Sequence, residues 1–133
     1  MNIIVCLDNN NGLMFNNRRQ SQDAQVRQDI LKLTQNSKLF MNTYSAKQFS
    51  EPNNIIVADD FCHIAGTGDY CFVENIDISP FSQKIEKIII YKWNRNYPSD
   101  FKFGIDLSHY TLITTRDFAG NSHDKITQEV YSK

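Results

Sequence analysis

The sequence predicts a single α/β domain over residues 1–133, with a mixed central sheet flanked by a few helices. Three observations support this prediction. Continuous apolar runs, which are typical of strands buried on both faces, recur along the chain. An apolar stripe at helical spacing separates the first two of these runs. Near the C-terminus, two segments of alternating polarity are joined by a turn, which indicates a β-hairpin.

The N-terminal half is expected to alternate strands with helices. The first strand occupies residues 3–7, a turn of residue types Asn-Asn-Asn-Gly follows at 9–12, and 16–20 form a polar loop. A helix begins after Ser21, a good N-cap, with Asp23 in its first turn facing the positive end of the helix dipole. Its apolar stripe consists of Val26, Ile30, Leu31 and Leu33. The elements that follow are a short strand at 38–41, a short helix at 44–49, a turn at 52–54 and a buried strand at 55–58.

The C-terminal half is expected to be richer in strands. Its longest apolar run, at 85–93, predicts a central strand. The other expected elements are a loop at 59–67, a strand at 70–73, a connection containing Pro80 at 76–83, an irregular segment at 94–107, and hairpin strands at 110–115 and 126–131 around a turn at 119–122.

Composition excludes several classes of function. Fourteen basic and fifteen acidic residues give a formal charge of −1, so no extended surface for nucleic acid or for an anionic membrane is expected. No apolar stretch approaches the ~20 residues of a membrane span, and no secretion signal precedes the first strand. The cysteines number three, an odd count, and Cys6 lies inside an apolar run. We therefore expect reduced thiols, a buried Cys6 and a cytoplasmic location.

The opening segment Ile-Ile-Val-Cys-Leu-Asp-Asn-Asn-Asn-Gly-Leu-Met-Phe, residues 3–15, resembles the first strand and substrate-side loop of dihydrofolate reductase. Residues 38–45 (Lys-Leu-Phe-Met-Asn-Thr-Tyr-Ser) resemble a strand of that family and the helix start after it. Residues 54–57 resemble its next strand, and 122–131 its closing hairpin strand. The similarity covers 2–57 and 85–131, and it implies a shortened, degenerate member of the dihydrofolate-reductase-like fold.

The residues that carry the family's chemistry are replaced. The resemblance places Val26 where the catalytic carboxylate of the family lies, with Asp23 and Asp29 one turn to either side. It aligns Ser21 with the tryptophan of the family's substrate loop. It aligns Pro52 with the arginine that clamps the substrate tail by paired hydrogen bonds. Without a buried acid to assist protonation of the pterin, hydride transfer would be very slow. We therefore assign no catalytic residue.

The cofactor side departs further from the family. The arginine that faces the extra phosphate of NADPH corresponds to Thr43, and the glycine before it corresponds to Asn42. The family's paired glycines, and the helix whose N-terminus receives the pyrophosphate, have no counterpart because the segment 73–85 is too short for them. Only Ser45 keeps a phosphate-binding hydroxyl. No cofactor is expected.

Basic residues gather beside the expected cleft. Arg18, Arg19 and Arg27, together with Lys38, are suited to a phosphate or carboxylate, and the alternative is that they are solvated loop and helix surface. The expected ligand-binding residues are Arg18, Arg19, Arg27, Asn42, Thr43 and Ser45. The stretch 91–97 mixes basic and aromatic residues that are suited either to stacking on a nucleoside or to covering a strand end.

Other chemical motifs are absent from the sequence or weak. Cys62-His63 with Cys71 lacks a fourth ligand for zinc, so no metal is expected. The three histidines are scattered, and the spacing typical of Ser-His-Asp hydrolases, the phosphate-binding Walker loop and the Gly-x-Gly-x-x-Gly loop are missing.

Three hypotheses of function follow. The first is a non-catalytic binding protein that takes a small anionic or nucleotide-like ligand and could sequester it. The second is a module that binds another protein or a second copy of itself, such as an inhibitor from a phage or mobile element. The third is an NADPH-dependent reductase with an altered substrate, against which Val26, Pro52 and the missing glycines weigh.

Overall fold

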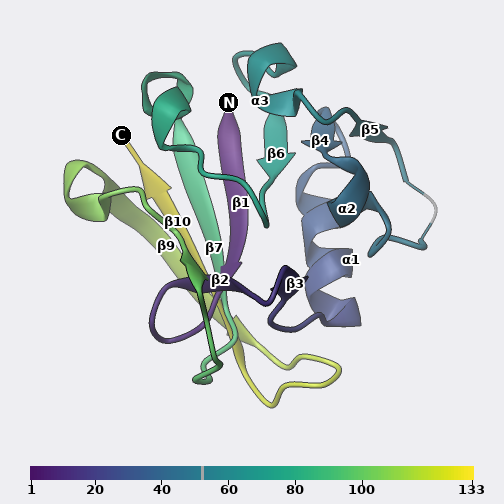
Figure 1. Ribbon diagram of the computed structural model, residues 1–133, viewed down its shortest axis with the longest axis vertical. Coiled ribbons are helices and arrows are strands. Elements are labelled where there is room, and N and C mark those ends of the chain that lie inside the picture. The colour runs from purple at the N-terminus through teal and green to yellow at the C-terminus, as the bar shows by residue number, and fades with distance from the viewer. Residues whose placement is uncertain (52) are drawn as a thin grey trace.

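The computed structural model describes residues 1–51 and 53–133 and has one twisted seven-stranded sheet at its centre (Figure 1). The strand order is β5-β4-β6-β1-β7-β10-β9. The central strand β1 (Asn2–Leu7) is parallel to β6 (Tyr70–Phe72) and to β7 (Lys87–Lys92). Strand β10 (Ile126–Ser132) runs antiparallel to β7, so the sheet is mixed as the sequence predicts.

Two hydrophobic clusters, one on each face of the sheet, explain why β1 is apolar throughout. Ile3 and Val5 belong to one cluster, which also contains Phe61, whereas Ile4 belongs to the other, which contains Ile30 of the first helix. Successive side chains of a strand point to opposite faces, so a strand covered on both sides needs a continuous apolar run. The predicted central strands are confirmed.

The first helix, α1 (Ala24–Leu33), begins two residues later than Ser21 would place it. Asp23 is the N-cap: its backbone is extended, and its carboxylate accepts a hydrogen bond from the N–H of Gln25. The prediction of Ser21 as the N-cap is therefore wrong, because aspartate caps a helix at least as well and here also has loop partners. Val26 is buried against the sheet, as is Ile30 one turn later.

A second, three-stranded sheet replaces parts of two segments that the sequence analysis treated as irregular. Its strands are β2 (Gly12–Phe15), β3 (Arg18–Arg19) and β8 (Phe101–Lys102), in the order β3-β2-β8. Strands β3 and β8 are only two residues long and β2 has four, so none is long enough for a pattern of alternation to reveal it.

The segment after α1 differs from expectation in three places. Strand β4 (Leu39–Met41) is buried as predicted, but the helix after it, α2 (Thr43–Ala46), has only four residues. Strand β5 (Ile55–Val57) is the edge of the sheet and is largely exposed, so its prediction as a buried strand is wrong. The predicted loop after it contains a short helix, α3 (Phe61–Ile64), which buries Phe61 and Cys62.

The predicted C-terminal hairpin is confirmed and is longer than expected. Strand β9 (Thr111–Phe118) pairs antiparallel with β10 and forms the second edge of the seven-stranded sheet. The remaining helical segments are 3-10 turns at Ser79–Lys84 and Leu107–His109. Among the residues that the structure describes, no helix is long and apolar enough to cross a membrane.

Candidate functional site

Arg19, one of the expected anion-binding residues, already holds a carboxylate of the protein itself. Its Nε donates to Oε2 of Glu74 at 2.9 Å, and its Nη2 donates to Oε1 at 3.1 Å. The guanidinium lies 4.5 Å from the ring centre of Tyr44, and Gln48 donates a further hydrogen bond to Glu74. The carboxylate of Glu74 takes one edge of the guanidinium fork and neutralises its charge, so Arg19 is less suited to an anionic ligand in this conformation.

Glu74 stands at the start of the segment where the resemblance would place paired glycines. It comes two residues after β6 and is buried. The segment 73–85 contains no glycine, and its one regular element is a short 3-10 helix at Ser79–Lys84. Where the resemblance would place the family's paired glycines, the segment begins with the carboxylate of Glu74, which is paired with Arg19.

Arg27 is likewise engaged within the protein. Its Nε donates to Glu51 at 2.9 Å and its Nη1 donates to Gln22 at 3.2 Å. Burial opposes the ionisation of Glu51, but the hydrogen bond and charge of Arg27, together with backbone N–H groups, outweigh it, so the pKa of Glu51 lies below its ordinary value. Pro52, which the resemblance aligns with the tail-binding arginine, lies outside the described residues.

The backbone N–H groups at the start of α2 are also taken. Asn42 is the N-cap and accepts from the N–H of Ser45 at 3.0 Å, while the N–H of Thr43 donates to Asp59 at 3.0 Å. Ser45 is fully buried, and its hydroxyl has no hydrogen-bond partner among the described residues. A short polar cap thus satisfies the helix start, and the hydroxyl of Ser45, expected to bind phosphate, lies in the core.

Arg18 differs from Arg19 and Arg27 because it is exposed and makes no ion pair with a described residue. It faces Phe15 across a two-residue hairpin turn, in which Asn16 and Asn17 both have positive φ. Both φ values are positive at the centre of a type I′ turn, and asparagine tolerates this conformation better than most residues. The turn thus places a free cation directly opposite an aromatic ring that is 40% exposed.

These two side chains border a hollow of about 470 Å³, which we call the loop pocket. It lies between the β2–β3 hairpin and the chain that follows β7. Its lining residues are Phe15, Asn16, Arg18, Arg19, Gln20, Tyr97 and Pro98. A cation, two aromatic rings and amide groups therefore surround a space large enough for a small ligand.

A second polar cluster joins residues that are far apart in the sequence. Asp23 accepts from the backbone N–H groups of Asn121 and Ser122, at 2.8 Å each, and from Nδ1 of His123 at 3.0 Å. The other ring nitrogen of His123, Nε2, lies 3.2 Å from the hydroxyl of Ser21 and 3.1 Å from that of Tyr97. Sequence spacing missed this cluster because the β9–β10 turn brings His123 to the start of α1 only in the folded chain.

The carboxylate of this cluster is strongly held in its charged form. Burial opposes the ionisation of Asp23, but the N–H groups of Asn121 and Ser122 and the ring of His123 outweigh it. The pKa of Asp23 therefore lies far below its ordinary value. Because a carboxylate only accepts hydrogen bonds, Nδ1 of His123 carries a proton, and in the neutral ring Nε2 is then the acceptor.

The two acids near Val26 are thus both committed to partners of their own. Asp29 accepts from the buried hydroxyl of Tyr91 at 2.6 Å and from Arg116 at 2.8 Å. Burial, together with the Asp29 carboxylate, raises the pKa of Tyr91 well above its ordinary value. Asp23 caps α1 and binds His123, as described above. Val26 itself packs in the core against the sheet.

Cys6 is a free thiol that is only partly covered, so its prediction as a buried residue is wrong. Burial of its sulfur, reinforced by the carboxylate of Glu74, raises the pKa of Cys6 well above its ordinary value. A thiol of raised pKa is a poor nucleophile at neutral pH. Among the described residues, no group of three or more His, Cys, Asp or Glu side chains is arranged to hold a metal ion.

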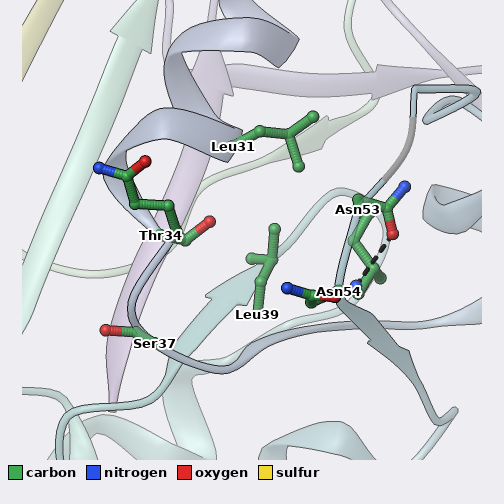
Figure 2. A pocket seen from close by; sticks show the side chains of 8 residues that line it. Leu31, Thr34, Ser37, Leu39, Asn53 and Asn54 are labelled. Atoms are coloured by element: carbon green, nitrogen blue, oxygen red, sulfur yellow. Dashed lines mark hydrogen bonds between the residues drawn. The ribbon is translucent and has the colours of Figure 1, made fainter.

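A smaller hollow of about 150 Å³ lies at the C-terminal end of α1 (Figure 2). Leu31, Thr34 and Leu39 line it on one side, and Asn53 with Asn54 on the other. The carboxamide of Asn53 turns back to accept the N–H of Ile55 at 2.9 Å. With no charged lining residue and little volume, this hollow offers less to a ligand than the loop pocket.

No protein-family model and no curated protein matches this chain. Solved structures do match it. The chain is similar to dihydrofolate reductase from Enterococcus faecalis, solved as a complex with NADP(H) and RAB-propyl. The TM-score is 0.70 at 10% sequence identity, and the match covers 98% of this chain and 94% of that chain. At this identity the likeness shows the fold alone. The chain therefore has a dihydrofolate-reductase-like fold.

Proposed function

We propose that this protein binds a small anionic or nucleotide-like ligand in the loop pocket and performs no reductase chemistry. The observation that carries the proposal is the pairing of the unpartnered cation of Arg18 with the exposed ring of Phe15 at the mouth of that pocket. An arginine suits a phosphate or carboxylate, and an aromatic face suits a base or another planar group. For Asn42 and Thr43 to contact a ligand, their present hydrogen bonds would have to break, and the buried Ser45 would have to become exposed.

The internal ion pair supports the absence of reductase chemistry. A pyrophosphate bound after β6 would meet the carboxylate of Glu74, and like charges at close range repel. Displacing Glu74 would leave Arg19 without its bidentate partner. The similar reductase is described with NADP(H). The present chain has the Arg19–Glu74 ion pair directly after β6.

Calorimetric titration tests this proposal with inorganic pyrophosphate, ADP and NADP as probes. We expect ADP to bind more tightly than pyrophosphate, because the ring of Phe15 adds stacking to the charge of Arg18. Arg18→Ala should weaken both probes, and Phe15→Ala only ADP. Lys87→Ala is the matched control, since this exposed cation lies at the other end of the sheet, beside Asn2. Equal binding to parent and Arg18→Ala would refute the site.

The exposed edge of the sheet supports a second candidate function, namely binding to a second copy or to another protein. Strand β9 is an edge with no proline, and Leu112 and Ile113 are 46% and 53% exposed. An unprotected edge of this length is a template for pairing with another strand. Light scattering on the purified protein tests this candidate. A dimer that Ile113→Lys converts to a monomer would support it. A parent protein that is monomeric and pairs with no other strand would refute it.

A further inference from the structure

The cluster around His123 contains an unbroken chain of hydrogen bonds from a carboxylate to a hydroxyl. Oδ2 of Asp23 lies 3.0 Å from Nδ1 of His123, and Nε2 of the same ring lies 3.2 Å from Oγ of Ser21. The order carboxylate, imidazole and hydroxyl is that of a nucleophilic triad, which is recognised by geometry and not by sequence order.

The surroundings of the ring suit the role of a general base. Asp23 and His123 are 2% and 3% exposed, so water does not compete for the bond between them. Trp93 stacks on the imidazole with ring centres 4.6 Å apart and an interplanar angle of 23°, which fixes the plane of the ring. With its proton on Nδ1, the ring presents a lone pair at Nε2 toward Ser21.

Ser21, unlike the other two members, is partly exposed, and it adjoins the loop pocket. Its chain neighbour Gln20 lines that pocket. Tyr97 lines it as well, and its hydroxyl shares Nε2 of His123 with Ser21. A substrate in the loop pocket would therefore lie beside the hydroxyl that the ring can activate.

We propose that Ser21 is a nucleophile activated by His123 for the hydrolysis of a small carboxylic ester. Oγ of Ser21 attacks the carbonyl carbon while its proton passes to Nε2. The carbon–oxygen bond to the leaving alcohol breaks, and Nε2 returns the proton to that alcohol. Water then attacks the acyl carbon while Nε2 of His123 takes its proton. The bond between that carbon and Oγ of Ser21 breaks, and Nε2 returns the proton to Oγ, which releases the carboxylic acid and restores Ser21. The inference rests on the proposed function in one respect only: anion binding by Arg18 would favour an ester that carries an anionic group.

Diisopropyl fluorophosphate tests the nucleophile directly on the whole protein. Oγ would form a bond to phosphorus as fluoride leaves, and the proton would pass to His123. We expect one adduct in the intact mass, mapped to Ser21. Ser21→Ala should lose the adduct, whereas Ser37→Ala, which removes an exposed serine elsewhere, should keep it. Labelling of Ser21 no faster than that of Ser37 would overturn the proposal.

Variants of the partners separate chemistry from folding. His123→Gln should slow labelling by roughly 100-fold or more, the usual range for the loss of a general base. Tyr97→Phe, which removes the competing hydroxyl, should label at least as fast as the parent. Asp23 acts through the ring as a positioning residue, so Asp23→Asn should lower the maximal labelling rate without changing the half-saturating probe concentration. Unchanged labelling in His123→Gln would contradict the proposal.

The test also distinguishes this inference from the ligand proposal. Arg18→Ala should keep the fluorophosphate adduct while losing affinity for pyrophosphate. Turnover of 4-nitrophenyl acetate, measured on the same set of variants, should fall with Ser21→Ala and His123→Gln but not with Ser37→Ala. An adduct without pyrophosphate binding supports the nucleophile alone, and binding without an adduct supports the pocket alone.

Discussion

The ion pair between Arg19 and Glu74 should contribute measurably to stability, because neither charge can be rehydrated fully when its partner is removed. The side chains of Arg19 and Glu74 are 20% and 9% exposed. Removing one partner of a well-buried pair costs about 3–5 kcal/mol of unfolding free energy. Because Arg19 is partly exposed, the cost of Glu74→Ala should fall just below that range, at about 2–3 kcal/mol.

A double-mutant cycle isolates the pairwise contribution. We expect Arg19→Met and Glu74→Gln to be coupled by about 1.5–3 kcal/mol, the range of charge-assisted hydrogen bonds. Urea unfolding followed by the fluorescence of Trp93 is the assay. The pair Lys92–Glu129, with the lysine 42% exposed, serves as the control and should couple by less than about 1 kcal/mol. Equal coupling energies in the two cycles would refute the idea that the Arg19–Glu74 pair stabilises the fold more than an exposed ion pair does.

Three further outcomes follow from the same geometry. The purified protein should show no NADPH-dependent turnover of dihydrofolate and no tight NADPH binding; measurable turnover would show that another acid serves in place of Val26. The lowered pKa of Asp23 means that its charge stabilises the fold above the ordinary aspartate pKa of about 3.9 and that this contribution is lost as the pH falls. The stability difference between the parent and Asp23→Asn in urea should therefore shrink on acidification, and a constant difference would contradict the assignment. Gly120→Ala should destabilise the fold, because a Cβ there would lie 2.6 Å from Asp23 Oδ2. Gly66→Ala is the control and should be nearly neutral, because its Cβ would meet nothing closer than 3.8 Å. Similar melting temperatures for the two variants would argue against a tight β9–β10 turn.

The sequence predicts most of the sheet because hydrophobic periodicity reports burial directly. The strands from Ile3 and from Lys87 are apolar on both faces, and each lies in the middle of the sheet. Prediction failed at Ile55, whose apolar run resembles a buried strand although β5 is an exposed edge. An apolar run shows that a strand is favourable, but the position of the strand in the sheet depends on tertiary contacts.

The site was harder to predict because pairing is a property of the folded chain. Arg18 and Arg19 are neighbours in sequence, yet only Arg19 reaches Glu74, since adjacent residues of a strand point in opposite directions. Asp23 and His123 are a hundred positions apart and meet only through the β9–β10 turn. Composition and spacing identify candidate groups, whereas the fold decides which of them are already satisfied.

Native mass spectrometry of the protein purified from its own host tests the central claim most directly. We expect a small anionic molecule bound to the parent chain and absent when Arg18→Ala is purified in the same way. The Lys87→Ala control should retain the molecule. A parent chain that carries no small molecule, and that appears instead as a dimer or with a protein partner, would contradict the claim and favour binding through the β9 edge.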